Sequence, residues 1–193
     1  LKRKSACKDK SLFLCVSSFL AEDIKSLYQG ITDLFQVRSL TEYVDDVIRI
    51  CESRKIDYSG ITFIQMLDML ATQTSFRYDL LIIDEMQDIS PSLLYSLSRL
   101  VSSSGQFICC YDPEQQPFDS DFPNKTAEEM GFTSVDTLTY NIRNTPEIMQ
   151  YFLSRCPSKT VWKSLAPSGA PVQELTVSNK GFSGIIDAVD SVL

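Results

Sequence analysis

Short apolar runs alternate along the chain with longer stretches in which apolar residues recur about every three to four positions. Continuous apolar runs are typical of strands buried on both faces, and the longer period is typical of amphipathic helices. The runs predict strands at Ser11–Val16, Leu34–Val37, Leu80–Ile83, Phe107–Tyr111 and Val135–Thr139. The periodic stretches predict helices over Leu20–Ile31, Leu40–Cys51 and Ser59–Gln73, and after the caps Ser90–Pro91 and Thr145–Pro146.

This alternation predicts an α/β fold, a parallel sheet with helices on both faces. Residues 156–171 are richer in Pro, Ser and Gly and show no clear period, so we expect a linker there. A further strand is predicted at Val172–Val177 and a helix at Gly184–Leu193. The length of 193 residues suits one domain, or one domain and part of another.

Composition narrows the class of protein. Hydrophobic residues make up 44% of the chain, so a folded core is expected. The net charge of −7 at pH 7 argues against strong nonspecific nucleic-acid binding by this chain alone. No apolar run approaches ~20 residues and no secretory signal is visible, so we expect no membrane span and an intracellular location, cytoplasmic or nuclear.

The cysteines predict core packing and not metal binding. The six of them form no CxxC pair, and the chain has no histidine that would help to hold zinc. Cys15, Cys109 and Cys110 lie in apolar runs, so we expect them to be reduced residues of the core.

The most informative segment for function is residues 78–90, YDLLIIDEMQDIS. Its apolar run ends on two adjacent acids, Asp84 and Glu85, and Gln87 and Asp88 follow. Ligand sites of parallel α/β sheets lie at the carboxyl ends of the strands, where one acid can hold Mg²⁺ and the next can orient or deprotonate water. From these residues alone, a buried strand that ends in a solvated acidic turn is an equally good interpretation.

Three segments, in this order, resemble motifs of the UvrD-like helicases, the superfamily-one motor ATPases. DEMQD at 84–88 resembles the DExQD box, ICCYDPEQQPF at 108–118 resembles GDxxQSIY, and LTYNIRNTPEI at 138–148 is similar to L-x-x-NYRS-x-x-I. The residues in register with the second and third motifs are Asp112, Gln115, Asn141 and Arg143.

The resemblance implies a RecA-like sheet of the P-loop NTPase type and a site that uses Mg²⁺ and ATP in the intact parent protein. It implies that Asp84 holds the metal and Glu85 activates water, and that Gln115 senses the γ-phosphate or positions water. Further roles fall to Arg143 as an arginine finger, to Gln87 and Asp112 as cofactor-binding residues, and to Phe118 as a base-stacking residue for single-stranded DNA. For each residue an alternative stays open. Gln87 and Asp88 either couple the site to neighbouring segments or cap the next helix, and Phe118 either stacks on a base or packs in the core. Gln115 is otherwise an exposed polar residue of a loop, and Arg143 otherwise forms an ion pair at the start of a helix.

The chain also departs from the family. The phosphate-binding loop, GxxxxGK[ST], is absent, since none of the seven glycines is followed by lysine. Because the chain begins with Leu1 and not Met, we expect this loop in an upstream segment of the parent. Pro117 and Phe118 stand where the family has Ile and Tyr, and Ile142 replaces the Tyr of NYR, which weakens the match where DNA contact is expected.

The expected organisation is a partial RecA-like helicase core domain in residues 1–156, followed by a linker and the start of a second such domain in 157–193. The function predicted is that of a fragment of an ATP-dependent UvrD-like DNA helicase or translocase. The alternative, from another class, is a non-catalytic helicase-like module that binds a protein partner.

Overall fold

The computed structural model describes residues 10–28, 35–112, 115, 129–155 and 163–174. Contacts along the chain divide it into two compact units, residues 1–133 and 134–193. The boundary predicted after residue 156 falls inside the second unit and stays a prediction.

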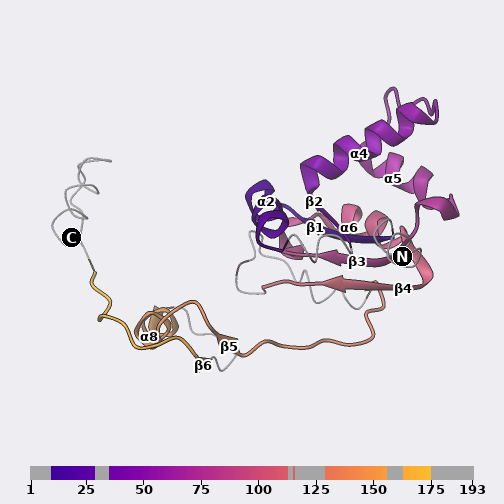
Figure 1. The fold of residues 1–193 in the computed structure, drawn as a ribbon. Coiled ribbons are helices and arrows are strands. Elements are labelled where there is room, and N and C mark those ends of the chain that lie inside the picture. The colour runs from indigo at the N-terminus through magenta and orange to yellow at the C-terminus, as the bar shows by residue number, and fades with distance from the viewer. Residues whose placement is uncertain (1–9, 29–34, 113–114, 116–128, 156–162, 175–193) are drawn as a thin grey trace, which may run out of the picture. The chain divides into compact units, whose positions relative to one another are not determined.

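The first unit contains a four-stranded sheet in the order β2-β1-β3-β4, in which every neighbouring pair is parallel (Figure 1). The α/β class with a parallel sheet is therefore confirmed. The strands are β1 (Ser11–Cys15), β2 (Gln36–Ser39), β3 (Tyr78–Ile83) and β4 (Val101–Cys109).

Helices cover both faces of this sheet, as predicted. Because successive side chains of a strand point to opposite faces, Leu12 and Leu14 of β1 enter one core, and Phe13 and Cys15 enter another. The first and larger core lies under the helices on one side of the strands in Figure 1, and the second lies under α2. The helices of the larger core are α4 (Leu40–Ser53), α5 (Phe63–Ala71) and α6 (Pro91–Ser98), and α2 spans Ser18–Leu27.

Side-chain caps explain where these helices begin. The Ser39 side chain accepts the N–H of Glu42, and the Glu42 carboxylate accepts the N–H of Ser39, so the two residues form a capping box at the start of α4. Thr62 and Gln65 form the same box before α5. Ser90 caps α6 and Pro91 takes its first position, as predicted. None of the helices in the described residues combines the length and apolar character that a membrane crossing requires.

Two predictions for the first unit were wrong in detail. The apolar stripe of α2 was extended too far: α2 contacts β1, β2 and α4, but Leu27 at its last position is 74% exposed and Tyr28 is 52% exposed. Strand β4 begins at Val101, earlier than predicted, because the polar residues after Val101 hid its pairing with Tyr78. Gly105 allows the backbone of β4 to lie close to Tyr78, since a Cβ at position 105 would lie 2.9 Å from the carbonyl oxygen of Tyr78.

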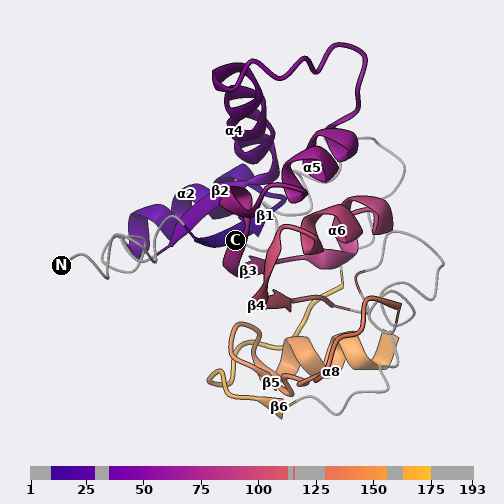
Figure 2. The ribbon, with the colours of Figure 1, turned by 90° about the vertical axis from the view of Figure 1, so that its right-hand side faces the viewer.

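The second unit contains helix α8 (Pro146–Arg155), which begins after Thr145 as predicted, and a short parallel pair of strands, β5 (Tyr140–Asn141) and β6 (Lys163–Ser164) (Figure 2). The strand predicted at Val135–Thr139 is wrong. Backbone pairing there begins only at the Thr139 carbonyl, which accepts the N–H of Lys163 at 3.0 Å.

The remaining predictions for this unit are settled only in part. Residues 172–174 form no strand, and the rest of Val172–Val177 lies outside the described residues, as does Gly184–Leu193.

The four cysteines of the described residues are free. Cys15 is buried as predicted and Cys109 is half-buried, but Cys110 is exposed, because it follows the last residue of β4.

Candidate functional site

The acids of the DEMQD segment lie at the carboxyl edge of the sheet, where three strands are linked by backbone hydrogen bonds. The N–H of Asp84 donates to the carbonyl of Leu14 at 2.9 Å, which links the exits of β3 and β1. On the other side, Cys110 donates its N–H to Ile83 at 2.8 Å and accepts the N–H of Met86 at 2.9 Å. The predicted position of the acids, where α/β sheets bind ligands, is therefore observed.

Glu85 has an unusual backbone conformation. Its φ of 53° lies in the left-handed region, which costs a residue other than glycine about 1–2 kcal/mol. The short 3₁₀ turn η2 (Met86–Asp88) follows it, and Asp88 donates its N–H to the carbonyl of Glu85 at 2.9 Å. Met86 and Ile89 anchor the turn, being 1% and 2% exposed. Burial of these apolar side chains holds the Glu85 backbone in its strained conformation.

A chain of hydrogen bonds joins Glu85 to the second motif. Gln87 Nε2 donates to Glu85 Oε2 at 2.5 Å, and Gln87 Oε1 accepts the N–H of Asp112 at 3.2 Å. Gln115 Nε2 then donates to Asp112 Oδ2 at 2.8 Å. Four of the predicted site residues, from two segments of the sequence, are thus brought together.

Asp84 and Glu85 place negative charge at this edge, which the neighbouring thiols sense. Burial, and then Asp84 and Glu42, raise the pKa of the Cys15 thiol to about 11. Burial, followed by Asp84 and Glu85, also raises the pKa of Cys110. In the described part of the chain, no Lys or Arg forms an ion pair with either acid of the pair Asp84–Glu85. A divalent cation is favoured in such surroundings.

The described residues contain no group of three or more His, Cys, Asp or Glu side chains arranged to hold a metal ion. Asp84 is half-buried at the edge and offers oxygen, the ligand that Mg²⁺ prefers. The donor set therefore fits a magnesium ion that draws its other ligands from phosphate and water, which is the usual way proteins bind this ion with nucleotides.

Arg143 lies in a turn that directly follows β5. Asn141 Oδ1 accepts the N–H of Arg143 at 3.0 Å and that of Asn144 at 2.9 Å, so the Asn141 side chain shapes this turn. Ser164 Oγ donates to the carbonyl of Asn144 at 2.7 Å. Arg143 itself is exposed. It belongs to the second unit, so its predicted place beside Glu85 stays a prediction.

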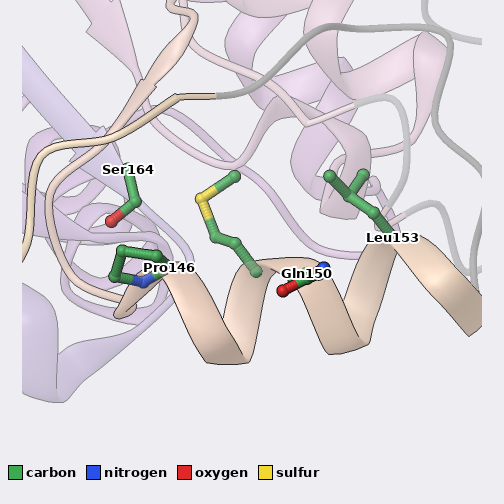
Figure 3. Close-up of a pocket in the computed structure, with 5 residues that line it drawn as sticks. Pro146, Gln150, Leu153 and Ser164 are labelled. Atoms are coloured by element: carbon green, nitrogen blue, oxygen red, sulfur yellow. The ribbon is translucent and has the colours of Figure 1, made fainter. Parts of the chain in front are cut away.

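The second unit also has a pocket of about 290 Å³, lined by Pro146, Met149, Gln150, Leu153 and Ser164 (Figure 3). These side chains are mostly apolar, and none of them is an acid, a base or a strong nucleophile. The pocket therefore differs in chemistry from the acidic edge of the sheet.

Three further points concern Phe118, the predicted helix cap and Cys110. Phe118 lies outside the described residues. The alternative in which Gln87 or Asp88 caps the next helix is wrong, because the N-cap of α6 is Ser90. Sequence reasoning missed Cys110, whose backbone links the two motifs and whose thiol lies near both acids. The position of Cys110 in the sequence, directly after an apolar run and before Tyr111–Asp112, could have indicated that it lies at the site.

A scan of the chain against protein-family models finds no match, and a search of curated proteins finds no relative. Function is therefore inferred from the residues of the site.

Proposed function

We propose that this chain carries the acidic part of the ATP-hydrolysing site of a UvrD-like helicase or translocase. The observation that supports this best is the hydrogen-bonded chain from Glu85 through Gln87 and Asp112 to Gln115 at the carboxyl edge of the sheet. These residues come from the two segments that resemble the DExQD and GDxxQ motifs. A solvated acidic turn gives no reason for a buried glutamine that joins the two segments.

Each residue then has a chemical role. Asp84 would hold Mg²⁺ through oxygen, and the bound ion would offset negative charge on the phosphates. Glu85 accepts a proton from the attacking water, and Gln115 orients that water or senses the γ-phosphate. Arg143 stabilises charge that develops on the transferred phosphoryl group. Hydrolysis would drive movement along single-stranded DNA, with Phe118 as a candidate stacking residue.

The sequence sets a limit on residues 1–193 by themselves. Nucleotide phosphates are normally held by the backbone amides of a glycine-rich loop and by its lysine. Because no glycine here is followed by lysine, we expect weak ATP binding and no appreciable hydrolysis by this chain alone. Clear turnover by purified residues 1–193, abolished by Glu85→Gln, would contradict this.

The test of the function uses the longest natural form of the protein. Where that form includes a phosphate-binding loop, Glu85→Gln should lower kcat by about 10³-fold or more and leave the affinity for ATP nearly unchanged, because the base acts on water in the transition state. Glu22→Gln, at an exposed position of α2, is the matched control and should leave both quantities unchanged. Near-normal turnover in Glu85→Gln would refute the assigned role.

A second candidate function is a non-catalytic interaction module. It is favoured by the missing phosphate-binding loop and by the apolar side chains that the second unit exposes, such as Leu138 at 83% and Ile142 at 78%. If the natural protein has no such loop, Glu85→Gln should leave its function intact, and capture of a protein partner should be insensitive to ATP.

A further inference from the structure

Gln87 is the largest of the three buried polar side chains in the described part of the chain, the others being Ser39 and Ser96. It is 4% exposed. A buried amide destabilises the fold unless its donors and acceptors are used, so its presence needs a reason. Both ends of this amide are in fact used: Nε2 binds Glu85 and Oε1 binds Asp112.

The chemistry of these partners fixes the orientation of the amide. The Glu85 carboxylate only accepts hydrogen bonds, so it requires the NH₂ end, and the backbone N–H of Asp112 only donates, so it requires the oxygen. Rotating the amide by half a turn would break both contacts. The Gln87 amide offers both the donor to Glu85 and the acceptor to Asp112 without a change of protonation.

The contact at Glu85 selects one carboxylate oxygen. Gln87 binds Oε2, whereas Oε1 has no hydrogen bond within the described residues. Since the Glu85 backbone is itself held in the left-handed region, the side chain projects from a fixed point and is oriented by Gln87. Oε1 is then the oxygen that remains for a water molecule.

We propose that Gln87 is a positioning residue, which orients Glu85 for proton abstraction and links it to the loop that carries Asp112 and Gln115. This inference rests on the proposed function, and it changes the role of Gln87 from nucleotide ligand to bridge. If a nucleotide displaced Asp112, the Gln87 side chain would move with it and change the orientation of Glu85, because the Gln87 amide is bonded to both residues.

Two substitutions separate the two ends of the bridge. Gln87→Met keeps the length and removes both hydrogen bonds. Gln87→Glu keeps an acceptor for the Asp112 N–H but replaces the donor to Glu85 by a second carboxylate. Amide hydrogen exchange at Asp112 should therefore accelerate in Gln87→Met and stay near the wild-type rate in Gln87→Glu. Gln73→Met, which changes a half-buried glutamine bonded to Arg54, is the control.

The double variant Glu85→Gln/Gln87→Glu exchanges the two side chains and restores a donor–acceptor pair. In residues 1–193, Gln87→Glu should lower the midpoint of urea unfolding, because two carboxylates then face each other, and adding Glu85→Gln should recover much of the loss. If the exchanged variant is no more stable than the sum of the single variants predicts, Gln87 does not hold Glu85 and the inference falls. This measurement needs no ATPase activity.

In the hydrolysing form of the protein, Gln87→Met should lower kcat by roughly 10²-fold with little change in KM for ATP, because a misplaced base slows chemistry more than binding. Gln87→Glu removes the donor to Glu85 and should likewise lower kcat with little change in KM for ATP. The exchanged variant should remain inactive although stable.

These outcomes separate the two ideas. A wild-type protein that has the loop but shows no turnover would overturn the proposed function, and the urea measurement would still decide whether Gln87 holds Glu85. Normal kcat in both Gln87 variants of an active protein would overturn the positioning role.

Discussion

Two turns carry the candidate catalytic residues, and they are supported very differently. The Glu85 turn lies on buried side chains, Met86, Gln87 and Ile89, and is bonded to two neighbouring strands. The Arg143 turn is shaped by one asparagine and is flanked by exposed apolar residues. Met149, 8% exposed, is the one buried apolar side chain among the described residues of the second unit.

The difference shows which part of the proposed site is arranged in advance by its own unit. The acids and the two glutamines are fixed within the first unit before any ligand arrives, which is the condition for electrostatic preorganisation. Arg143 is exposed on the second unit, where the one side chain that shapes its turn is Asn141 among the described residues. The following experiments test this contrast in order of expected effect.

Arg143→Ala gives the largest expected effect. In a hydrolysing form of the protein, it should lower kcat by about 10³-fold or more, because a charge-stabilising arginine is lost. Since Arg143 is exposed, the stability of the chain should hardly change. Arg155→Ala is the control: this arginine belongs to the same unit, pairs with Glu174 and lies over the ring of Tyr151. Equal losses of kcat in the two variants would contradict a specific role for Arg143.

Truncation of a core side chain should distinguish the two units by stability. Leu81 of β3 is fully buried, so Leu81→Ala should lower the free energy of unfolding by about 2–5 kcal/mol. Met149→Ala should cost less, near the lower end of this range, because Met149 lines a pocket and its surroundings are less closely packed. Urea unfolding followed by circular dichroism measures both. A larger loss for Met149 would reverse the contrast.

Helix caps offer a smaller and closely matched comparison. Ser39→Ala should cost about 1–2 kcal/mol, because the buried Ser39 hydroxyl no longer accepts the N–H of Glu42. Thr145→Ala should cost less, roughly 0.5 kcal/mol, since the N–H of Ile148 lies 3.4 Å from the Thr145 hydroxyl oxygen. Both changes are read from urea midpoints, and equal costs would show that burial of the cap adds nothing.

The smallest effect concerns alkaline pH. Burial raises the pKa of Cys15 to about 11 and that of Cys109 to about 12, above the usual 9.0. The folded state then holds these protons more tightly than the unfolded state, so this stability is present below pH 9 and declines as the pH rises toward 11–12. Cys15→Ala should reduce the decline in urea midpoint between pH 8 and about 10.5. An unchanged slope would exclude Cys15 as a source.

The sequence was sufficient where the pattern was local and strong. The apolar run before Asp84 and the Ser90–Pro91 cap predicted β3 and the start of α6 correctly. The sequence failed where pairing or packing decides the structure. Val135–Thr139 has the composition of a strand but pairs only from Thr139 onward, and Leu27 lies on the predicted apolar face of α2 but is exposed at its last position.

The site was predicted as a set of residues but not as a geometry. Sequence order brought Glu85, Gln87, Asp112 and Gln115 together through the motif resemblance, whereas the left-handed backbone of Glu85 and the two-ended bond of Gln87 have no local sequence signal. Both depend on the neighbouring strand β4, whose exit at Cys110 accepts the N–H of Met86.

The register shift between β3 and β4 has a consequence for how this sequence can change in length. Tyr78 pairs with Val101 but Leu80 pairs with Gln106, so residues 102–105 are accommodated in an irregular segment at the amino end of the sheet. An insertion or deletion within 102–104 would alter only that segment, far from the acids. An insertion after Gln106 would move Cys110 away from Met86 and turn Phe107 out of the core. Natural variation in length is therefore expected within 102–104, before Gln106, and not after Gln106.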